Sequence, residues 1–112
     1  MTAMITWDDF EKIDMRVGTV QAVNDFPKAR NPAYQLIIDF GELGIRKSSA
    51  QITRFYSKEQ LVGRQVIAIV NFPPKQIADF MSECLVLGVM GDNKEITLLQ
   101  PERPVPDGFR IG

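Results

Sequence analysis

Short β-rich segments, separated by glycine or proline, recur along this chain. The clearest is segment 34–40, in which every second residue is large and apolar: Tyr34, Leu36, Ile38 and Phe40. A period of two places these side chains on one face of a strand. Further strands are expected over 15–23, 45–52, 65–72, 83–89 and 95–99. Segment 65–72 is almost continuously apolar, which is typical of a strand buried on both faces.

Two short helices are predicted between the strands. Thr6 is a suitable N-cap for a helix over 7–13, and segment 57–60 (Ser-Lys-Glu-Gln) is a capping box for a single turn that ends at Gly63. About five main strands, with a short helix between the third and the fourth, is the element order of a Greek-key barrel of the OB type. We therefore expect one all-β domain over 1–112, with another small Greek-key barrel as the alternative.

The remaining segments are predicted to be turns, a connector and a tail. Gly18 interrupts the first strand, where a bulge or a barrel bend is expected. Pro27 and Pro32 fix a loop, and 41–44 is a hairpin turn. Segment 75–80 is expected to connect two strands, and the proline-rich tail 101–112 to be extended.

The composition argues against catalysis. The chain contains no histidine and a single cysteine, Cys84. The commonest general base and metal ligand is therefore absent, and no thiolate cluster can form. Cys84 has no basic neighbour in sequence, so a buried, inert thiol is expected. A pair of Lys47 with Ser48 is disfavoured because adjacent strand residues point to opposite faces. We predict no enzyme activity, no metal and no cofactor.

Charge and hydropathy suggest a cytoplasmic protein with one basic region. The formal net charge is −1, but the segments 1–27, 28–75 and 76–112 carry −3, +5 and −3. The basic middle could form one positive face, or its charges could simply solvate strand edges and loops. No apolar run approaches the length of a membrane span, and the first residues lack the pattern of a signal peptide.

Two polar regions predict a groove for an extended ligand. Lys47, Ser49 and Gln51 share one face of the third strand by their period of two. Rim residues Asn71, Lys75 and Ser82 follow the fourth strand, with Ile77 and Phe80 as an apolar floor. Polar groups beside apolar surface suit a peptide or a single-stranded nucleic acid. Alternatively, Asn71 and Ser82 satisfy only loop backbone groups.

Several motifs resemble those of the bacterial CsaA secretion chaperones, which are part of the wider tRNA-binding-domain family. They are the segments 14–18 (Asp-Met-Arg-Val-Gly), 48–53 (Ser-Ser-Ala-Gln-Ile-Thr), 70–75 (Val-Asn-Phe-Pro-Pro-Lys), 82–88 (Ser-Glu-Cys-Leu-Val-Leu-Gly) and the ending over 99–108. tRNA-binding relatives typically read Ser-x-Gly-Met where this chain has 82–85. The resemblance covers essentially the whole chain.

The resemblance implies a homodimer. We interpret the chain as a cytoplasmic chaperone that holds unfolded precursor polypeptides for export, and the sequence leaves open whether an export motor is a further partner. A stand-alone tRNA-binding protein is the alternative. Its affinity would depend on neutralising phosphates, and a chain with a pI near 5.4 has few cations for that task. Apolar residues outside the barrel would join the subunits: Trp7, Phe10, Phe109 and Ile111.

Overall fold

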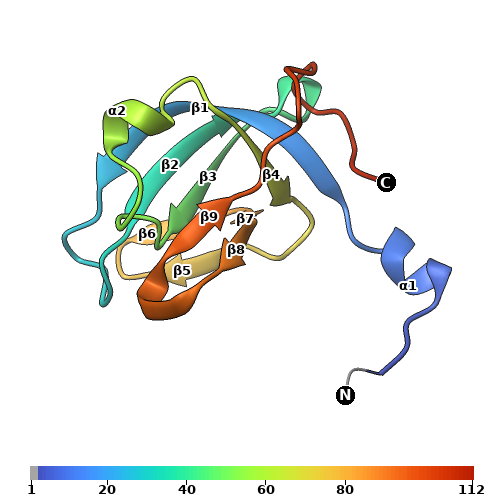
Figure 1. Cartoon of the computed structure of the whole chain (residues 1–112), viewed down its shortest axis with the longest axis horizontal. Helices are drawn as coiled ribbons and strands as arrows, with labels where there is room; N and C mark the ends of the chain where they lie inside the picture. The colour runs from blue at the N-terminus through green and yellow to red at the C-terminus, as the bar shows by residue number, and fades with distance from the viewer. Residues whose placement is uncertain (1–2) are drawn as a thin grey trace.

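The computed structural model describes residues 3–112 and shows a nearly closed, five-stranded antiparallel barrel (Figure 1). The strand order is β3-β2-β1-β4-β7. The strands are β1 (Met15–Asp25), β2 (Tyr34–Asp39), β3 (Ile45–Ala50), β4 (Gln65–Ile69) and β7 (Leu85–Val86). A short helix lies between β3 and β4, so the OB-type architecture predicted from the element order is confirmed.

The barrel closes between β3 and the residues just before β7. The Glu83 N–H donates to the Lys47 carbonyl at 2.7 Å, and the Lys47 N–H donates to Glu83 Oε1 at 3.0 Å. The buried Ser48 hydroxyl donates to the Cys84 carbonyl at 3.0 Å. These contacts satisfy backbone groups that the free edge of β3 would otherwise expose.

The core has the one-faced pattern expected for segment 34–40. Leu36, Ile38 and Phe40 are fully buried. In β4, Val66 and Ala68 are fully buried, whereas the alternate residues are only half-buried. The expectation that this strand is buried on both faces was therefore wrong, because its outer face is covered only in part.

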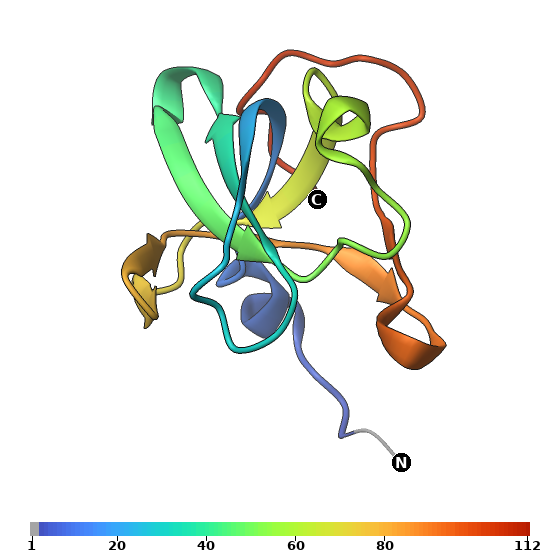
Figure 2. The same ribbon diagram turned by 90° about the vertical axis from the view of Figure 1, so that its left-hand side faces the viewer.

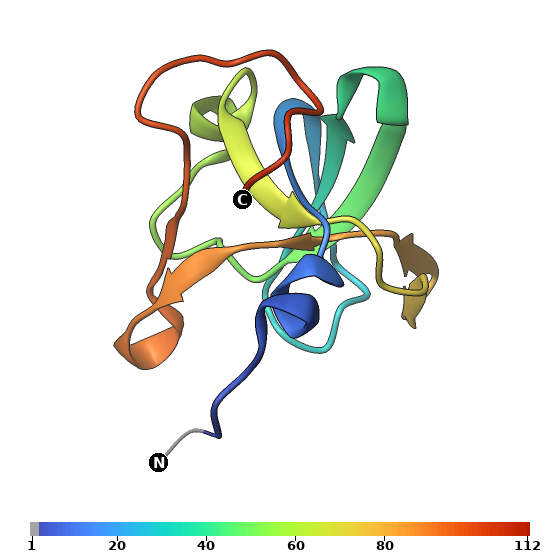
Figure 3. The same cartoon turned by 90° about the vertical axis from the view of Figure 1, so that its right-hand side faces the viewer.

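Both predicted helices are present, and each begins with a capping box. The helix α1 (Trp7–Glu11) is capped by Thr6 with Asp9, and α2 (Lys58–Leu61) by Ser57 with Gln60. The helix α2 inserts its fully buried Leu61 into the core. In contrast, α1 has no buried residue and projects from one end of the barrel, ending two residues earlier than expected (Figures 1 and 3).

Two small hairpins project from the barrel, one on each side of the loop 26–33 (Figure 2). The first pairs β5 (Lys75–Ile77) with β6 (Phe80–Ser82), where the sequence predicted only a connector. The second pairs β8 (Gly88–Met90) with β9 (Ile96–Leu98) around the 3-10 turn η2 (Asp92–Lys94). The strand expected over 83–89 is divided at Leu87, because its second half leaves the barrel to form this hairpin.

The first strand bends, and the C-terminal tail forms backbone hydrogen bonds with it. The register irregularity lies between Val20 and Ala22 rather than at Gly18. Gly18 is required by packing, because a Cβ there would lie 2.6 Å from Ile38 Cγ2. The turn expected at 41–44 is the 3-10 helix η1 (Gly41–Leu43), and the extended tail follows β1, with the Val17 N–H donating to the Phe109 carbonyl at 3.0 Å. No helix within residues 3–112 is long and apolar enough to cross a membrane.

Candidate functional site

A hollow of about 390 Å³ lies between β3, the segment after β4 and the β5–β6 hairpin, and we call it the apolar groove. It includes four of the eight residues predicted to bind ligand. The lining residues are Ser49, Phe72, Pro73, Lys75, Ile77, Ser82, Cys84 and Leu85. The side chains of Phe72 and Leu85 are 53% and 46% exposed, so the groove presents an apolar surface that no other part of residues 3–112 covers.

The polar groups of the apolar groove differ in their availability. The Ser82 hydroxyl accepts from the Ser49 N–H at 3.1 Å and donates to the Cys84 carbonyl at 3.4 Å, so it helps to close the barrel. Lys75 is exposed and forms no ion pair with any residue of 3–112. A ligand would therefore meet apolar side chains and one positive charge at the rim.

Phe80 and Lys47 lie beside this groove rather than in its lining. Phe80 is 7% exposed and packs against Phe26 with a distance of 5.4 Å between the ring centroids. The ammonium group of Lys47 lies 5.2 Å from the centre of the Phe80 ring, a cation–π arrangement. Phe80 anchors the hairpin against Phe26 and Lys47, and Phe72 and Leu85 supply the exposed floor of the groove.

Gln51 lies in a different hollow, of about 300 Å³, which we call the basic cleft. Its lining residues are Pro32, Gln51, Thr53, Arg54, Asn93 and Lys94. The strand β3 ends at Ala50, so the alternation that pairs Lys47 with Ser49 does not extend to Gln51.

Asn71 lies at the junction between the barrel and α1. Its Oδ1 accepts from the Asp14 N–H at 3.0 Å, and its Nδ2 donates to the Lys12 carbonyl at 2.6 Å. Both atoms of the amide are thus bonded to backbone, as the alternative interpretation of this residue expected.

The single thiol is buried between the groove and the core. Cys84 is 6% exposed, and burial raises its pKa to about 11, although the nearby Arg46 guanidinium and a hydrogen bond with Ser48 act in the opposite direction. A thiol with this pKa is protonated at neutral pH and is a poor nucleophile.

A second apolar surface surrounds α1. A hollow of about 620 Å³, the α1 groove, is lined by Ile5, Thr6, Trp7, Phe10 and Gly112. Trp7 is 87% exposed, and Phe109 on the neighbouring tail is 59% exposed. Phe10 and Ile111 are half-buried. All four residues predicted at a subunit interface therefore keep accessible apolar surface.

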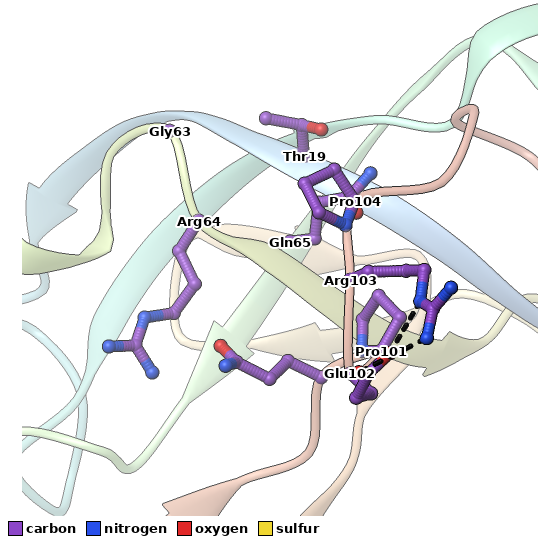
Figure 4. Close-up of a pocket in the computed structure, with 9 residues that line it drawn as sticks. Thr19, Gly63, Arg64, Gln65, Pro101, Glu102, Arg103 and Pro104 are labelled. Atoms are coloured by element: carbon purple, nitrogen blue, oxygen red, sulfur yellow. Dashed lines mark hydrogen bonds and ion pairs between the residues drawn. The ribbon is translucent and has the colours of Figure 1, made fainter.

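A third hollow, of about 520 Å³, lies where the tail crosses β4 (Figure 4). Most of its polar groups already have partners. Gln65 donates to the Val105 carbonyl at 2.6 Å and accepts from the Val105 N–H at 3.0 Å. Glu102 pairs with Arg103 at 2.6 Å, and Arg64 points away from the tail, with its guanidinium 5.1 Å from the centre of the Tyr56 ring. The two bonds between Gln65 and Val105 hold the tail against β4 and indicate a structural role.

The predicted set of ligand-binding residues lacked four residues that line the groove: Phe72, Pro73, Cys84 and Leu85. Leu85 reaches the apolar groove because β7 is short and lies next to the closing contacts of β3. Its place depends on the barrel closure, for which the local sequence contains no signal.

Comparisons with known proteins agree on one family. Residues 15–110 match the family described as "Putative tRNA binding domain". The methionine–tRNA ligase of Thermococcus kodakarensis is 34% identical over 96% of this chain. The chain spans only 14–16% of the length of such curated relatives.

Two solved structures are similar over nearly the whole chain. The chaperone CsaA from Bacillus anthracis is 50% identical, with a TM-score of 0.94, and the match covers 98% of this chain and 100% of that one. The CsaA chaperone protein from Picrophilus torridus is 51% identical, with a TM-score of 0.91, over 97% and 100% of the two chains.

Proposed function

The chain belongs to the tRNA-binding-domain family, and from this membership and its likeness to the CsaA chaperones we propose that it is a cytoplasmic, homodimeric chaperone for unfolded polypeptides. The apolar groove is the observation that carries this proposal. The side chains of Phe72 and Leu85 line this groove and are exposed, and no other part of the described chain covers them. Exposed apolar surface of this kind is typical of an interaction site.

An extended polypeptide would suit the chemistry of the groove. Among residues 3–112, the strand β5 pairs with β6 alone, so its other edge is unpaired there. An open edge offers backbone donors and acceptors to an incoming strand, and neighbouring apolar pockets accept alternate side chains. Because the backbone contacts are independent of sequence and the lining is mainly apolar, the groove would suit many different unfolded chains.

The clients we propose are precursor polypeptides held before export, with delivery to an export motor as the next step. Export-competent precursors must stay unfolded, and an unfolded chain exposes apolar segments that a folded protein buries. Weak, sequence-tolerant binding would keep such segments from aggregating and would still permit release.

The experiment that tests the groove measures the affinity for a permanently unfolded, fluorescently labelled polypeptide. Phe72→Ser should weaken binding about tenfold, which corresponds to about 1.4 kcal/mol. Phe55→Ser is the matched control, because Phe55 is 50% exposed and does not line the groove. Equal affinities of the two variants and the wild type, with unchanged folding, would contradict the proposal.

The second candidate is tRNA binding, which is favoured by the family match over residues 15–110. The overall net charge of −1 argues for modest affinity, since phosphate neutralisation supplies most of such binding. Tight binding of bulk tRNA at 150 mM salt, about physiological ionic strength, without measurable binding of the unfolded polypeptide would reverse the order of the two candidates.

A further inference from the structure

We propose that Arg110 is a positioning residue for the subunit interface, because it fixes the direction in which α1 leaves the barrel. The proposal rests on the homodimer proposed above and assigns to one side chain the task of holding the two parts of that interface together. These parts are α1, with Trp7 and Phe10, and the tail, with Phe109 and Ile111. The end of the tail lies close to α1 (Figures 1 and 3).

Three consecutive backbone carbonyls at the exit of α1 accept hydrogen bonds from side chains of distant segments. The last carbonyls of a helix have no partner within the helix itself. Here the Glu11 and Ile13 carbonyls accept from Arg110 Nη2 at 3.0 and 3.4 Å. The Lys12 carbonyl, between them, accepts from Asn71 Nδ2 at 2.6 Å. Arg110 therefore supplies two of the three side-chain bonds to this end of the helix.

The charge of Arg110 also suits this position. Its Nη2 lies 3.9 Å from Glu11 Oε2, and its Nε lies 3.8 Å from Asp14 Oδ1. An arginine near a helix C-terminus can bond the last carbonyls and interacts favourably with their partial negative charge. The side chains of Arg110 and Asp14 are only part-exposed, so solvent screens this pair less than it would a fully exposed one.

The tail holds the backbone of Arg110 in place. The Phe109 carbonyl accepts from β1 at 3.0 Å, and the Ile111 N–H donates to β1 at 2.8 Å. These two bonds lie on either side of Arg110, whose backbone is opposite Arg16 of β1. Because its own backbone is fixed, the Arg110 side chain fixes α1 relative to Phe109 and Ile111.

The helix α1 depends on contacts of this kind. It has five residues, and none of them is buried. A helix of this length is not stable alone in water, so without its side-chain bonds it would lose a fixed direction. Association would then cost the entropy of ordering the helix, whereas a helix that is already positioned avoids this cost. Removing Arg110 should therefore weaken association, although every apolar interface residue is still present.

The test measures the dimer dissociation constant by sedimentation for the wild type and for matched variants. Arg110→Gln removes the charge and shortens the side chain, and it should raise this constant about tenfold, as expected for the loss of one or two hydrogen bonds. Arg110→Lys keeps a cationic donor and should retain most of the affinity. Arg103→Gln is the control and should leave the constant unchanged, because Arg103 lies on the same tail and pairs with its neighbour Glu102.

A second readout follows the helix itself. Trp7 is the only tryptophan of the chain and lies on α1, so its fluorescence reports the motion of the helix. At concentrations at which the proteins are monomeric, Arg110→Gln should show a lower Trp7 anisotropy than the wild type, since a released terminus moves rapidly. A role of Arg110 in barrel stability alone would leave this anisotropy unchanged. If Arg110→Gln does not unfold in one cooperative transition, Arg110→Met, which retains most of the aliphatic stem, takes its place.

The outcomes separate this proposal from the proposed function. A wild type that stays monomeric at high concentration would contradict the homodimer, and with it any role of Arg110 in association. A wild-type dimer whose dissociation constant is unchanged in Arg110→Gln would overturn the positioning role alone. Equal weakening by Arg103→Gln would indicate a general effect of charge and would overturn that role as well.

Discussion

Asn71 connects the helix α1 to the barrel through both atoms of its side-chain amide. The two bonds, to Asp14 and Lys12, span the junction at which α1 leaves the first strand. A residue used in this way is expected to contribute to stability rather than to ligand affinity, although it lies in the same segment as Phe72 and Lys75.

We predict that Asn71→Ala lowers the free energy of unfolding by about 1–2 kcal/mol, since each hydrogen bond contributes about 1 kcal/mol. The affinity for the unfolded polypeptide should not change. Thermal unfolding and anisotropy measure the two effects. Asn24→Ala is the control, because Asn24 is exposed on β1 and its side chain has no hydrogen bond within residues 3–112. Lost affinity at unchanged stability would place Asn71 in the binding surface.

Cys84 links stability to pH. Its pKa is about 11 in the folded protein and 9.0 for an ordinary thiol, because burial disfavours the thiolate. Below pH 9 the thiol is protonated in both the folded and the unfolded protein, so its titration does not change the free energy of unfolding. Above pH 9 the thiol of the unfolded protein loses its proton first. The free energy of unfolding therefore falls as pH rises towards 11, by up to about 1.4 kcal/mol per pH unit.

The pH prediction is checked by denaturant unfolding at several pH values for the wild type and for Cys84→Ala. The difference between the two proteins should be constant below pH 9 and should shrink between pH 9 and 11, by about 1–3 kcal/mol in total. Other titrating groups are common to both proteins and cancel in the difference. A constant difference over the whole range would show that the thiol titrates equally in both states.

At the scale of elements, the β5–β6 hairpin turns at a residue poorly suited to its conformation. Ala78 has a φ of 53°, which places its Cβ close to the backbone. We predict that Ala78→Gly raises the free energy of unfolding by about 0.5–1 kcal/mol, since the relief of strain exceeds the entropy that glycine adds to the unfolded chain. Ala22→Gly, in β1, should destabilise and serves as the control. A loss of stability in Ala78→Gly would contradict this account.

The same hairpin shows where local sequence stops predicting structure. Segment 34–40 and the two capping boxes were predicted correctly because their signals are local: a period of two and a residue spacing of three. The hairpin was missed because its turn contains no glycine or asparagine, the residues that usually mark a left-handed position. Its stability comes instead from the burial of Phe80 against Phe26.

The candidate site was predictable only in part for a similar reason. Ser49, Lys75, Ile77 and Ser82 do line one groove. Gln51 was grouped with Ser49 by alternation, but β3 ends at Ala50 and the chain turns towards the basic cleft. The strand end and the barrel closure that carries Leu85 depend on contacts between distant segments, which strand periodicity does not encode.

At the scale of the whole molecule, two of the hollows are lined mainly by exposed apolar side chains, and they lie in separate places. The apolar groove involves the β5–β6 hairpin, and the α1 groove involves the two ends of the chain. We assign the first to client polypeptides and the second to a second copy of this chain. No residue lines both hollows, so the two proposed partners would not compete for the same side chains.

The proposed dimer would make stability depend on protein concentration. If folding and association are coupled, a tenfold higher concentration stabilises the native dimer by about 1.4 kcal/mol and should raise Tm by about 2–4 °C. Trp7→Ser should abolish this dependence, because Trp7 is 87% exposed in the single chain and would be covered in the dimer. Phe55→Ser, the control, should retain this dependence.

Sedimentation should show twice 12.6 kDa for the wild type and the control, and 12.6 kDa for Trp7→Ser at micromolar concentration. A wild type that sediments at 12.6 kDa, with a constant Tm, would refute the homodimer and leave the α1 groove without an assigned partner.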